Sequence, residues 1–329
     1  MATVTDEDQR AQSLHGRALV IDGMNNAGLT HDYFAQMIAG GVSAAMVPVS
    51  ITDTFVVAVE KILALRAMVE ASDVALIVEN SGDIDLAKSS GRIGLVLALE
   101  DARQFEKDLR KVDLFRRLGV RRSQLVYTTL NEVGCGAGDR LDTGLSKYGV
   151  RLIGELERCG ILIDLSHAGP QTLDDALEVV THPCVWSHCN VQGVFGHKNN
   201  LTDDHLTAVA ANGGVVGVSG VPFYTGGPDV TLSDMIDHVD YVVERIGVDH
   251  VGIGLAIFEN HPLSFYDQFA SLPVDVYGTP PWEWPTGIST VSEFPNVTGE
   301  LVRRDYPDED ILKILGGNML RVCTDAWST

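Results

Sequence analysis

Residues 161–188, ILIDLSHAGPQTLDDALEVVTHPCVWSH, contain the pattern that decides the fold. Two short apolar runs, 161–165 and 183–187, are typical of buried strands, and the stretch between them has the apolar spacing of a helix. A strand, a helix and a second strand in this order predict two parallel strands that are covered by the helix. Because each strand ends at a histidine, His167 or His188, both imidazoles are expected at the same end of the sheet.

The same unit recurs along the chain. The runs predicted to be strands are 18–22, 42–49, 93–99, 122–128, 161–165, 183–187, 214–219 and 250–255. The helix-like stretches between them are 53–71, 106–118, 145–158, 170–180, 203–212 and 231–247. Eight such units predict a (β/α)8 TIM barrel in a single domain, residues 1–329, with the run 74–78 as a short strand outside the barrel. The alternative is an open doubly wound sheet, but no GxGxxG motif follows any run.

Composition narrows the classes of partner. The chain has 329 residues, a net charge of −21 and a pI of about 4.7, which disfavours nucleic acid and anionic membranes. The first ten residues, MATVTDEDQR, lack the basic and apolar regions of a signal peptide, and no apolar run approaches the roughly 18 residues of a membrane span. The five cysteines include no CxxC pair, which favours reduced thiols. We therefore expect a cytoplasmic protein that binds a small molecule, without a nucleic acid or membrane partner.

Three potential metal ligands stand at the ends of predicted strands. Glu100 follows the run 93–99, while His167 and His188 end the two strands described above. In a barrel the carboxyl ends of all strands open to one mouth, so these three side chains are expected to converge. One carboxylate and two imidazoles form a ligand set for zinc or iron(II) with open coordination positions. The alternative is that each histidine is a hydrogen-bonded structural residue.

An aromatic-rich C-terminal extension, residues 258–294, follows the last predicted strand. It holds eight of the chain's 22 aromatic residues: Phe258, Phe265, Tyr266, Phe269, Tyr277, Trp282, Trp284 and Phe294. Because the extension starts at the carboxyl end of a strand, it begins on the face where barrel enzymes keep their sites. It is either a packing or dimer-contact loop, or an aromatic pocket wall or lid.

Motifs spread over nearly the whole chain point to one family. They are IDG at 21–23, DLSHAGPQTLDDALE at 164–178, PCVWSHCN at 183–190, NNLTDDHLTAVAANGGVVGV at 199–218, DHVGIG at 249–254 and ILGGNMLRV at 314–322. With these motifs the sequence resembles the membrane (renal) dipeptidase family, peptidase family M19, within the amidohydrolase-like metal-dependent barrels. The interval of 21 residues from His167 to His188 also agrees with the family's two histidine ligands. The resemblance implies a dinuclear zinc site that hydrolyses dipeptides, in proteins that are often homodimers.

The resemblance also assigns roles to residues, and part of the family's metal site is retained. Glu100 matches the bridging carboxylate, and His167 and His188 match the two histidine ligands of one metal. The HxD pair that holds the second metal in the family is replaced by Met24 and Asn26. A thioether is a soft ligand and a neutral amide oxygen is a weak one, so we expect at most one divalent metal. Zinc is the first choice, iron(II) is the second, and a site without metal is the third.

Three further positions depart from the family. In the family an aspartate after the eighth strand transfers protons, and here it is Ala256. The family's substrate-binding histidine of the fourth strand is Tyr127, and its substrate-binding arginine in the loop after the sixth strand is Asn199. Hydrolysis still needs a proton carrier. The candidate catalytic residues are therefore Tyr127, His261 and Glu259.

The same departures bear on substrate. Without the family's arginine and histidine, the site lacks the side chains that would bind the carboxylate and the developing oxyanion of an ordinary dipeptide. The candidate substrate-binding residues are Met24, Asn26, Tyr127 and Asn199. We expect a less charged or more aromatic small metabolite.

Three functions remain open from the sequence. The first is a dipeptidase-like hydrolase with at most one metal, acting on an amide or related bond of a small metabolite. The second is a non-hydrolytic metal enzyme on the same barrel, such as a non-haem Fe(II) oxygenase, a lyase or a decarboxylase. The third is a non-catalytic dipeptidase-like protein, because fold alone does not determine function.

Overall fold

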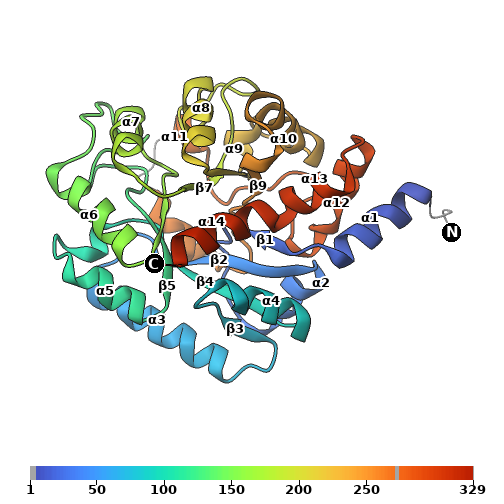
Figure 1. Cartoon of the computed structure of the whole chain (residues 1–329), viewed down its shortest axis with the longest axis horizontal. Helices are drawn as coiled ribbons and strands as arrows, with labels where there is room; N and C mark the ends of the chain where they lie inside the picture. The colour runs from blue at the N-terminus through green and yellow to red at the C-terminus, as the bar shows by residue number, and fades with distance from the viewer. Residues whose placement is uncertain (1–4, 271–273, 329) are drawn as a thin grey trace.

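A closed barrel of eight parallel strands forms the centre of the computed structural model, which describes residues 5–270 and 274–328 (Figure 1). The barrel strands are β1 (Val20–Asp22), β2 (Val42–Ser50), β4 (Ile93–Leu99), β5 (Val120–Gln124), β6 (Leu162–Asp164), β7 (Val185–Cys189), β8 (Val215–Val218) and β9 (Val251–Ile253). Pairing of β2 with β4 closes the ring. A further strand, β3 (Ala75–Ile77), pairs with β4 outside the ring. The predicted TIM barrel with one outer strand is confirmed.

Helices surround the barrel. They are α1 (Asp6–Arg17), α2 (His31–Ala39), α3 (Phe55–Glu70), α4 (Ser81–Ser90), α5 (Arg110–Arg117), α6 (Lys147–Arg158), α7 (Pro170–Val179), α8 (Asp203–Asn212), α9 (Pro222–Thr225), α10 (Leu232–Ile246), α11 (Val274–Tyr277), α12 (Pro295–Arg303), α13 (Asp308–Leu312) and α14 (Asn318–Trp327). Short 3₁₀ turns lie at Arg103–Phe105, Val248–His250, Leu263–Phe269 and Val291–Glu293, and a π-turn at Lys313–Gly317 joins α13 to α14.

The predicted helices correspond to α3, α5, α6, α7, α8 and α10, with small shifts at their ends. Local signals explain where they begin. For example, α8 starts after Thr202, whose hydroxyl accepts a hydrogen bond from the backbone of His205, and α7 starts with Pro170 in its first turn. The largest difference is in the run 122–128, because β5 ends at Gln124 and Tyr127 lies in the loop beyond it.

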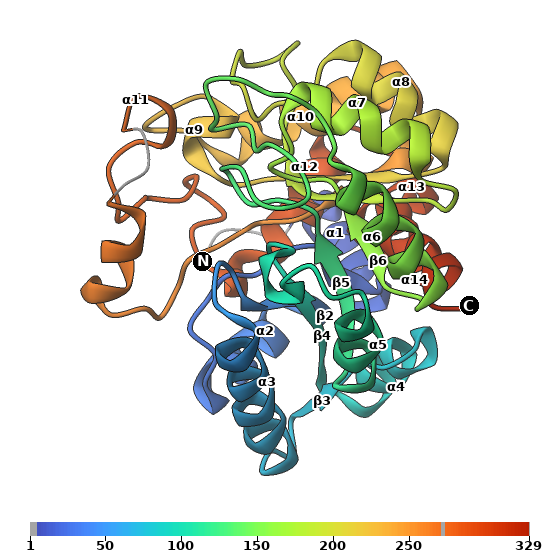
Figure 2. The same ribbon diagram turned by 90° about the vertical axis from the view of Figure 1, so that its left-hand side faces the viewer.

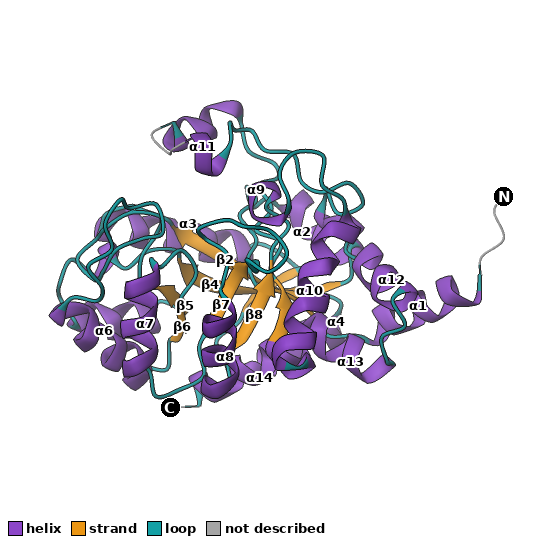
Figure 3. Cartoon of the chain, turned by 90° about the horizontal axis from the view of Figure 1, so that it is seen from above, coloured by secondary structure: helices purple, strands orange, loops and turns teal. Residues whose placement is uncertain are grey.

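The amino-terminal end of the barrel is closed by α14. Its apolar face packs against the first inward-facing residues of the strands, including Leu162, Val185 and Val215. The indole nitrogen of Trp327 donates to the backbone oxygen of Arg121, at 3.0 Å. In Figure 3, α14 lies below the strands and α11 lies above them, so the open mouth is at the carboxyl ends. Figure 2 shows the orange segment around α11 standing to one side of the barrel.

No membrane-spanning helix is present in the described part of the chain, since none of its helices is both long enough and apolar enough to cross a bilayer. The five cysteines are all buried, and they are free thiols rather than disulfides. Buried free thiols of this kind pack as small apolar side chains. The interior therefore depends on packing rather than on covalent links.

Three glycines allow close packing around one backbone carbonyl at the mouth. A Cβ atom at Gly254 would lie 1.7 Å from the oxygen of Ser187, one at Gly217 would lie 2.2 Å from it, and one at Gly23 would lie 2.8 Å from it. These distances are shorter than any normal contact, so any side chain would push Ser187 away. Because His188 is the next residue, the glycines also determine where its imidazole lies.

We therefore predict that Gly254→Ala destabilises the fold, by about 1–3 kcal/mol through overpacking. Gly154→Ala is the matched control, since a Cβ at this exposed glycine inside α6 would meet no atom within 4 Å and alanine is the better helix former. The control should gain about 0.5–1 kcal/mol. Urea unfolding measures both free energies of unfolding, and a Gly254→Ala protein as stable as the wild type would contradict the packing described here.

Candidate metal centre and its aromatic cavity

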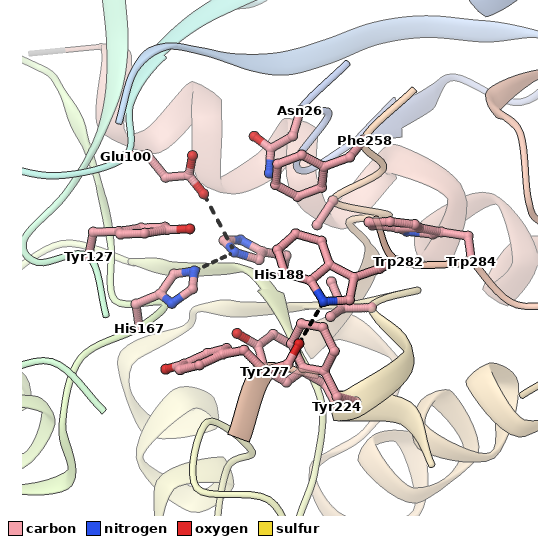
Figure 4. A pocket seen from close by; sticks show the side chains of 13 residues that line it. Asn26, Glu100, Tyr127, His167, His188, Tyr224, Phe258, Tyr277, Trp282 and Trp284 are labelled. Atoms are coloured by element: carbon pink, nitrogen blue, oxygen red, sulfur yellow. Dashed lines mark hydrogen bonds and ion pairs between the residues drawn. The ribbon is translucent and has the colours of Figure 1, made fainter. Parts of the chain in front are cut away.

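The three predicted ligands converge at the mouth. Glu100 follows β4, His167 follows β6 and His188 lies in β7. The Nε2 atoms of His167 and His188 are 2.9 Å apart, and Nε2 of His188 is 3.9 Å from Oε1 of Glu100. One ligand atom from each residue lies within 4.8 Å of the other two, and Figure 4 shows the three side chains pointing toward one another. Convergence from three separate strands thus brings together a group of side chains that could hold a metal ion.

The donor groups suit a divalent cation. Burial lowers the pKa of His167 to about 4 and that of His188 well below its ordinary value, so both imidazoles are neutral. Burial raises the pKa of Glu100 to about 8, although the charge of Arg122 opposes the shift. The second oxygen of Glu100, Oε2, is buried and has no hydrogen-bond partner. A cation would satisfy this oxygen and relieve the opposed lone pairs of the two imidazoles.

Hydrogen bonds fix the tautomer of His188. The hydroxyl of Ser187 donates to Oδ2 of Asp164 at 2.5 Å, and it lies 2.9 Å from Nδ1 of His188. Because the single hydroxyl proton is used on Asp164, Ser187 accepts from Nδ1–H of His188. The lone pair of His188 is therefore on Nε2, which faces Glu100. Outer partners of this kind orient metal-ligating histidines in general.

His167 is held by different means. Its backbone has φ of 66°, in the left-handed region that residues other than glycine rarely occupy. Its Nδ1 lies 3.3 Å from the hydroxyl oxygen of Thr128 and 3.4 Å from the amide nitrogen of Asn199. In the tautomer in which Nδ1–H donates to Thr128, Nε2 is free for a metal. The ring of Tyr127 lies over the imidazole, with 4.6 Å between ring centroids. Figure 4 shows the Tyr127 hydroxyl directed toward the ligand cluster.

On the β1 side of the mouth, positions 24 and 26 carry a thioether and an amide, and the described residues form no second group of three potential metal ligands there. Met24 is fully buried, and its sulfur lies 3.4 Å from Nη2 of Arg122. Asn26 lines the cavity beside Glu100, is only 6% exposed, and has a buried Oδ1 without a partner. Met24 is thus below the cavity and Asn26 is in its wall.

A network of phenols surrounds Asn199. The amide nitrogen of Asn199 donates to the hydroxyl of Tyr224 at 3.1 Å, and its oxygen accepts from the hydroxyl of Tyr277 at 3.3 Å. Burial raises the pKa of Tyr277 to about 12 and that of Tyr224 well above its ordinary value, so both phenols are neutral. The sequence did not predict Tyr224 as a site residue, although its position shortly after a barrel strand was a usable signal. Tyr277 was noted only as part of the aromatic extension.

Aromatic side chains form the other wall of the narrow cavity in front of the ligand cluster. The residues that contribute rings to this wall are Phe223, Tyr224, Phe258, Tyr277, Trp282 and Trp284. Hydrogen bonds orient both indoles, since Trp284 donates to the oxygen of Leu255 at 3.0 Å and Trp282 to the oxygen of Tyr277 at 2.6 Å. In Figure 4 the rings of Phe258, Trp282 and Trp284 lie across from Glu100 and His167. The aromatic extension therefore supplies a pocket wall as well as packing.

Two predicted proton carriers are not brought to the ligand cluster. The carboxylate of Glu259 accepts from the hydroxyl of Tyr33 and from the backbone of Val291, both at 2.9 Å. Nε2 of His261 lies 2.6 Å from the backbone oxygen of Asn26. Neither residue lines the cavity. Their side chains hold the loops around β1, and a catalytic role for them stays a prediction.

Comparison with known sequences places the chain in a family. The model of the membrane dipeptidase family, peptidase family M19, matches residues 9–264 and 275–328. The chain belongs to the M19 family. It is 31% identical over 242 residues to dipeptidase aclJ of Aspergillus oryzae, covering 72% of this chain and 52% of that protein. It is 30% identical over 271 residues to dipeptidase verJ of Clonostachys rogersoniana, covering 78% of this chain and 64% of that protein. The chain thus spans about half to two thirds of the length of these two dipeptidases.

Solved structures share the fold of this chain. An amidohydrolase from Pseudomonas aeruginosa is 33% identical, with a TM-score of 0.92 over 97% of this chain and 99% of that one. The M19 metallopeptidase described as dipeptidase AC is 21% identical, with a TM-score of 0.80 over 95% of this chain and 99% of that one, and it shows the shared fold. The M19 family is metal-dependent, in keeping with the Glu100, His167 and His188 cluster.

The positions that we predicted to depart from the M19 pattern lie together around one mouth. Asn26, Tyr127 and Ala256 line the cavity, and Asn199 contacts two of its tyrosines. Met24 is buried just beneath the cavity. The residues are far apart in sequence, so their clustering is a property of the fold.

We predict that Glu100→Gln and His188→Ala each abolish metal binding, because each removes one of three ligands. The matched control is Glu79→Gln, since Glu79 is an exposed carboxylate paired with Arg66. Metal content after purification without added metal, measured by mass spectrometry, gives the result. A ligand variant that keeps full metal content would show that the metal is held elsewhere.

Metal affinity should also depend on pH. A metal replaces the proton on Glu100 at any pH below about 8, while His167, with a pKa of about 4, is already neutral above pH 5. The association constant for zinc should therefore rise about tenfold per pH unit from about pH 5.5 to 7.5 and level off above about 8. Competition with a coloured chelator measures it. A flat profile over this range would mean that Glu100 is ionised before metal binds.

Proposed function

We propose that this chain is a hydrolase that uses one divalent metal, held by Glu100, His167 and His188, to cleave an amide or related bond in a small metabolite. The observation that carries the proposal is the position of this ligand cluster at the base of a cavity whose opposite wall is aromatic. Zinc is the metal we expect, because a carboxylate with two imidazoles suits it and leaves a position open. Iron(II) is the second choice.

The chemistry divides between the metal and Tyr127. A bound divalent metal would lower the pKa of a coordinated water and polarise the substrate carbonyl. We assign to Tyr127 the role of hydrogen-bond donor to the oxygen that gains negative charge. Burial, and then the charge of Glu100, raise the pKa of Tyr127 well above its ordinary value, which favours the protonated phenol. A donor held in a dry site of this kind stabilises an oxyanion more than water does.

The lining of the cavity supports a neutral, ring-bearing substrate. No lysine or arginine is among the described residues that line it. Asn199, which we expect near the substrate, already bonds the hydroxyls of Tyr224 and Tyr277. On the aromatic side of the cavity, away from the metal ligands, a carboxylate would be desolvated without a cationic side chain beside it, which is costly, whereas an aromatic ring would pack against the indoles. An ordinary dipeptide, with a free carboxylate, therefore fits poorly.

Hydrolysis of a matched substrate panel tests the proposal. Zinc-loaded protein is assayed with amides of aromatic acids that carry neutral leaving amines and with free dipeptides of similar size. We expect measurable kcat/KM for the aromatic amides and at least tenfold less for the dipeptides. Equal or better cleavage of the dipeptides would contradict the substrate assignment. If the zinc-loaded protein cleaved none of these compounds, the proposed hydrolytic activity would be contradicted.

Removal of the Tyr127 hydroxyl tests its role. Tyr127→Phe should lower kcat by about 100-fold, with little change in KM, because one oxyanion donor is lost. Tyr241→Phe is the control, since the hydroxyl of Tyr241 bonds the exposed Asp203 on the outside of the barrel. Metal content should be unchanged in both variants. A Tyr127→Phe enzyme with full kcat would exclude the phenol from the reaction.

A further inference from the structure

A guanidinium lies buried beneath the metal centre and takes no part in the ligand set. Arg122, in β5, is 0% exposed. Its Nη1 forms an ion pair with Asp164, whose side chain is also 0% exposed. Its Nη2 donates to the sulfur of Met24 at 3.4 Å, and its Nε is buried without a partner. The cation thus fills the barrel interior between Asp164 and the β1 side of the mouth.

The guanidinium of Arg122 lies close enough to the β1 side of the centre to affect metal binding there. The charge of Arg122 acts on Glu100, in the opposite sense to the charge of Asp164. Two buried carboxylates therefore share one fixed positive charge inside the barrel. Arginine does not lose its proton in proteins, so this charge is permanent. Any divalent ion beside Met24 and Asn26 would meet it in a medium of low polarity, where like charges repel strongly.

We propose that the guanidinium of Arg122 occupies the place of a second cation on the β1 side, so that the centre accepts a single metal. Met24 fits this role because its neutral, polarisable sulfur accepts a hydrogen bond from the guanidinium. An imidazole at this position would instead hold a metal cation close to the guanidinium. The inference rests on the proposed one-metal function. It attributes the absence of a second metal on the β1 side to the fixed charge of Arg122 as well as to the lack of metal ligands there.

The consequence is that ligands alone do not create a second site. Met24→His together with Asn26→Asp places an imidazole and a carboxylate next to Glu100, which are good zinc ligands. With Arg122 retained, this double variant should still bind one zinc per chain. When Arg122→Gln is added, the charge is removed while a hydrogen-bonding group remains for Asp164, and the stoichiometry should rise to two.

A matched variant separates charge from shape. Arg122→Lys in the same double variant keeps a positive charge, so it should bind one zinc. Stoichiometry is measured by mass spectrometry after equilibration with excess zinc and removal of free ion, with circular dichroism to verify folding. If Arg122→Gln does not fold, the pair Arg122→Met with Asp164→Asn removes both buried charges together and should give two zinc ions in the double variant.

The outcomes distinguish the two proposals. Two zinc ions in the double variant, either with Arg122 retained or with Arg122→Lys added, would overturn the role of the charge, while the one-metal hydrolase would stand. One zinc ion after removal of the charge in folded protein would overturn it as well. No zinc in the wild-type chain would overturn the proposed function itself.

Discussion

The buried carboxylate of Asp164 is the interaction on which the site depends. It pairs with Arg122, accepts from the hydroxyl of Ser187, and accepts from the backbone nitrogens of Ser166 and Ser187. Breaking a buried ion pair costs about 3–5 kcal/mol when one charge is left without a partner. Asp164 therefore couples the stability of the barrel interior to the orientation of the histidine that follows Ser187.

Above this carboxylate, the mouth divides into two sides with different chemistry. One side presents Glu100 and two neutral imidazoles, and the other presents indole and phenol rings. The division follows from topology, because the ligands come from β4, β6 and β7 while most of the rings come from the extension after β9. A substrate with a polar bond next to an aromatic group would use both sides. The fold determines the arrangement, and the residues at the mouth determine the chemistry.

The sequence predicted the features that follow from regular structure. Glu100, His167 and His188 were predicted to converge because carboxyl ends of parallel strands meet at one mouth. The positions of side chains that lie in loops were harder to predict from the sequence. Glu259 and His261 were expected near the site from closeness in sequence, but left-handed backbone at Ala256 and Asn260, with φ of 53° and 59°, turns this loop toward β1.

Two other features could not be predicted from the pattern alone. Tyr277 reaches Asn199 across 78 residues of sequence, a contact that only the path of the aromatic extension creates. Arg122 stands beside Arg121 in β5, and both are buried. Alternation places them on opposite faces of the strand, but it does not say which one faces the barrel interior.

We infer that one metal lies between Glu100, His167 and His188, with none on the β1 side. A crystal structure of the protein grown with zinc, with anomalous data collected on both sides of the zinc and iron absorption edges, tests this most directly. We predict a single anomalous peak within bonding distance of the three ligands. A second peak beside Met24 and Asn26, or no peak at the three ligands, would contradict a one-metal centre.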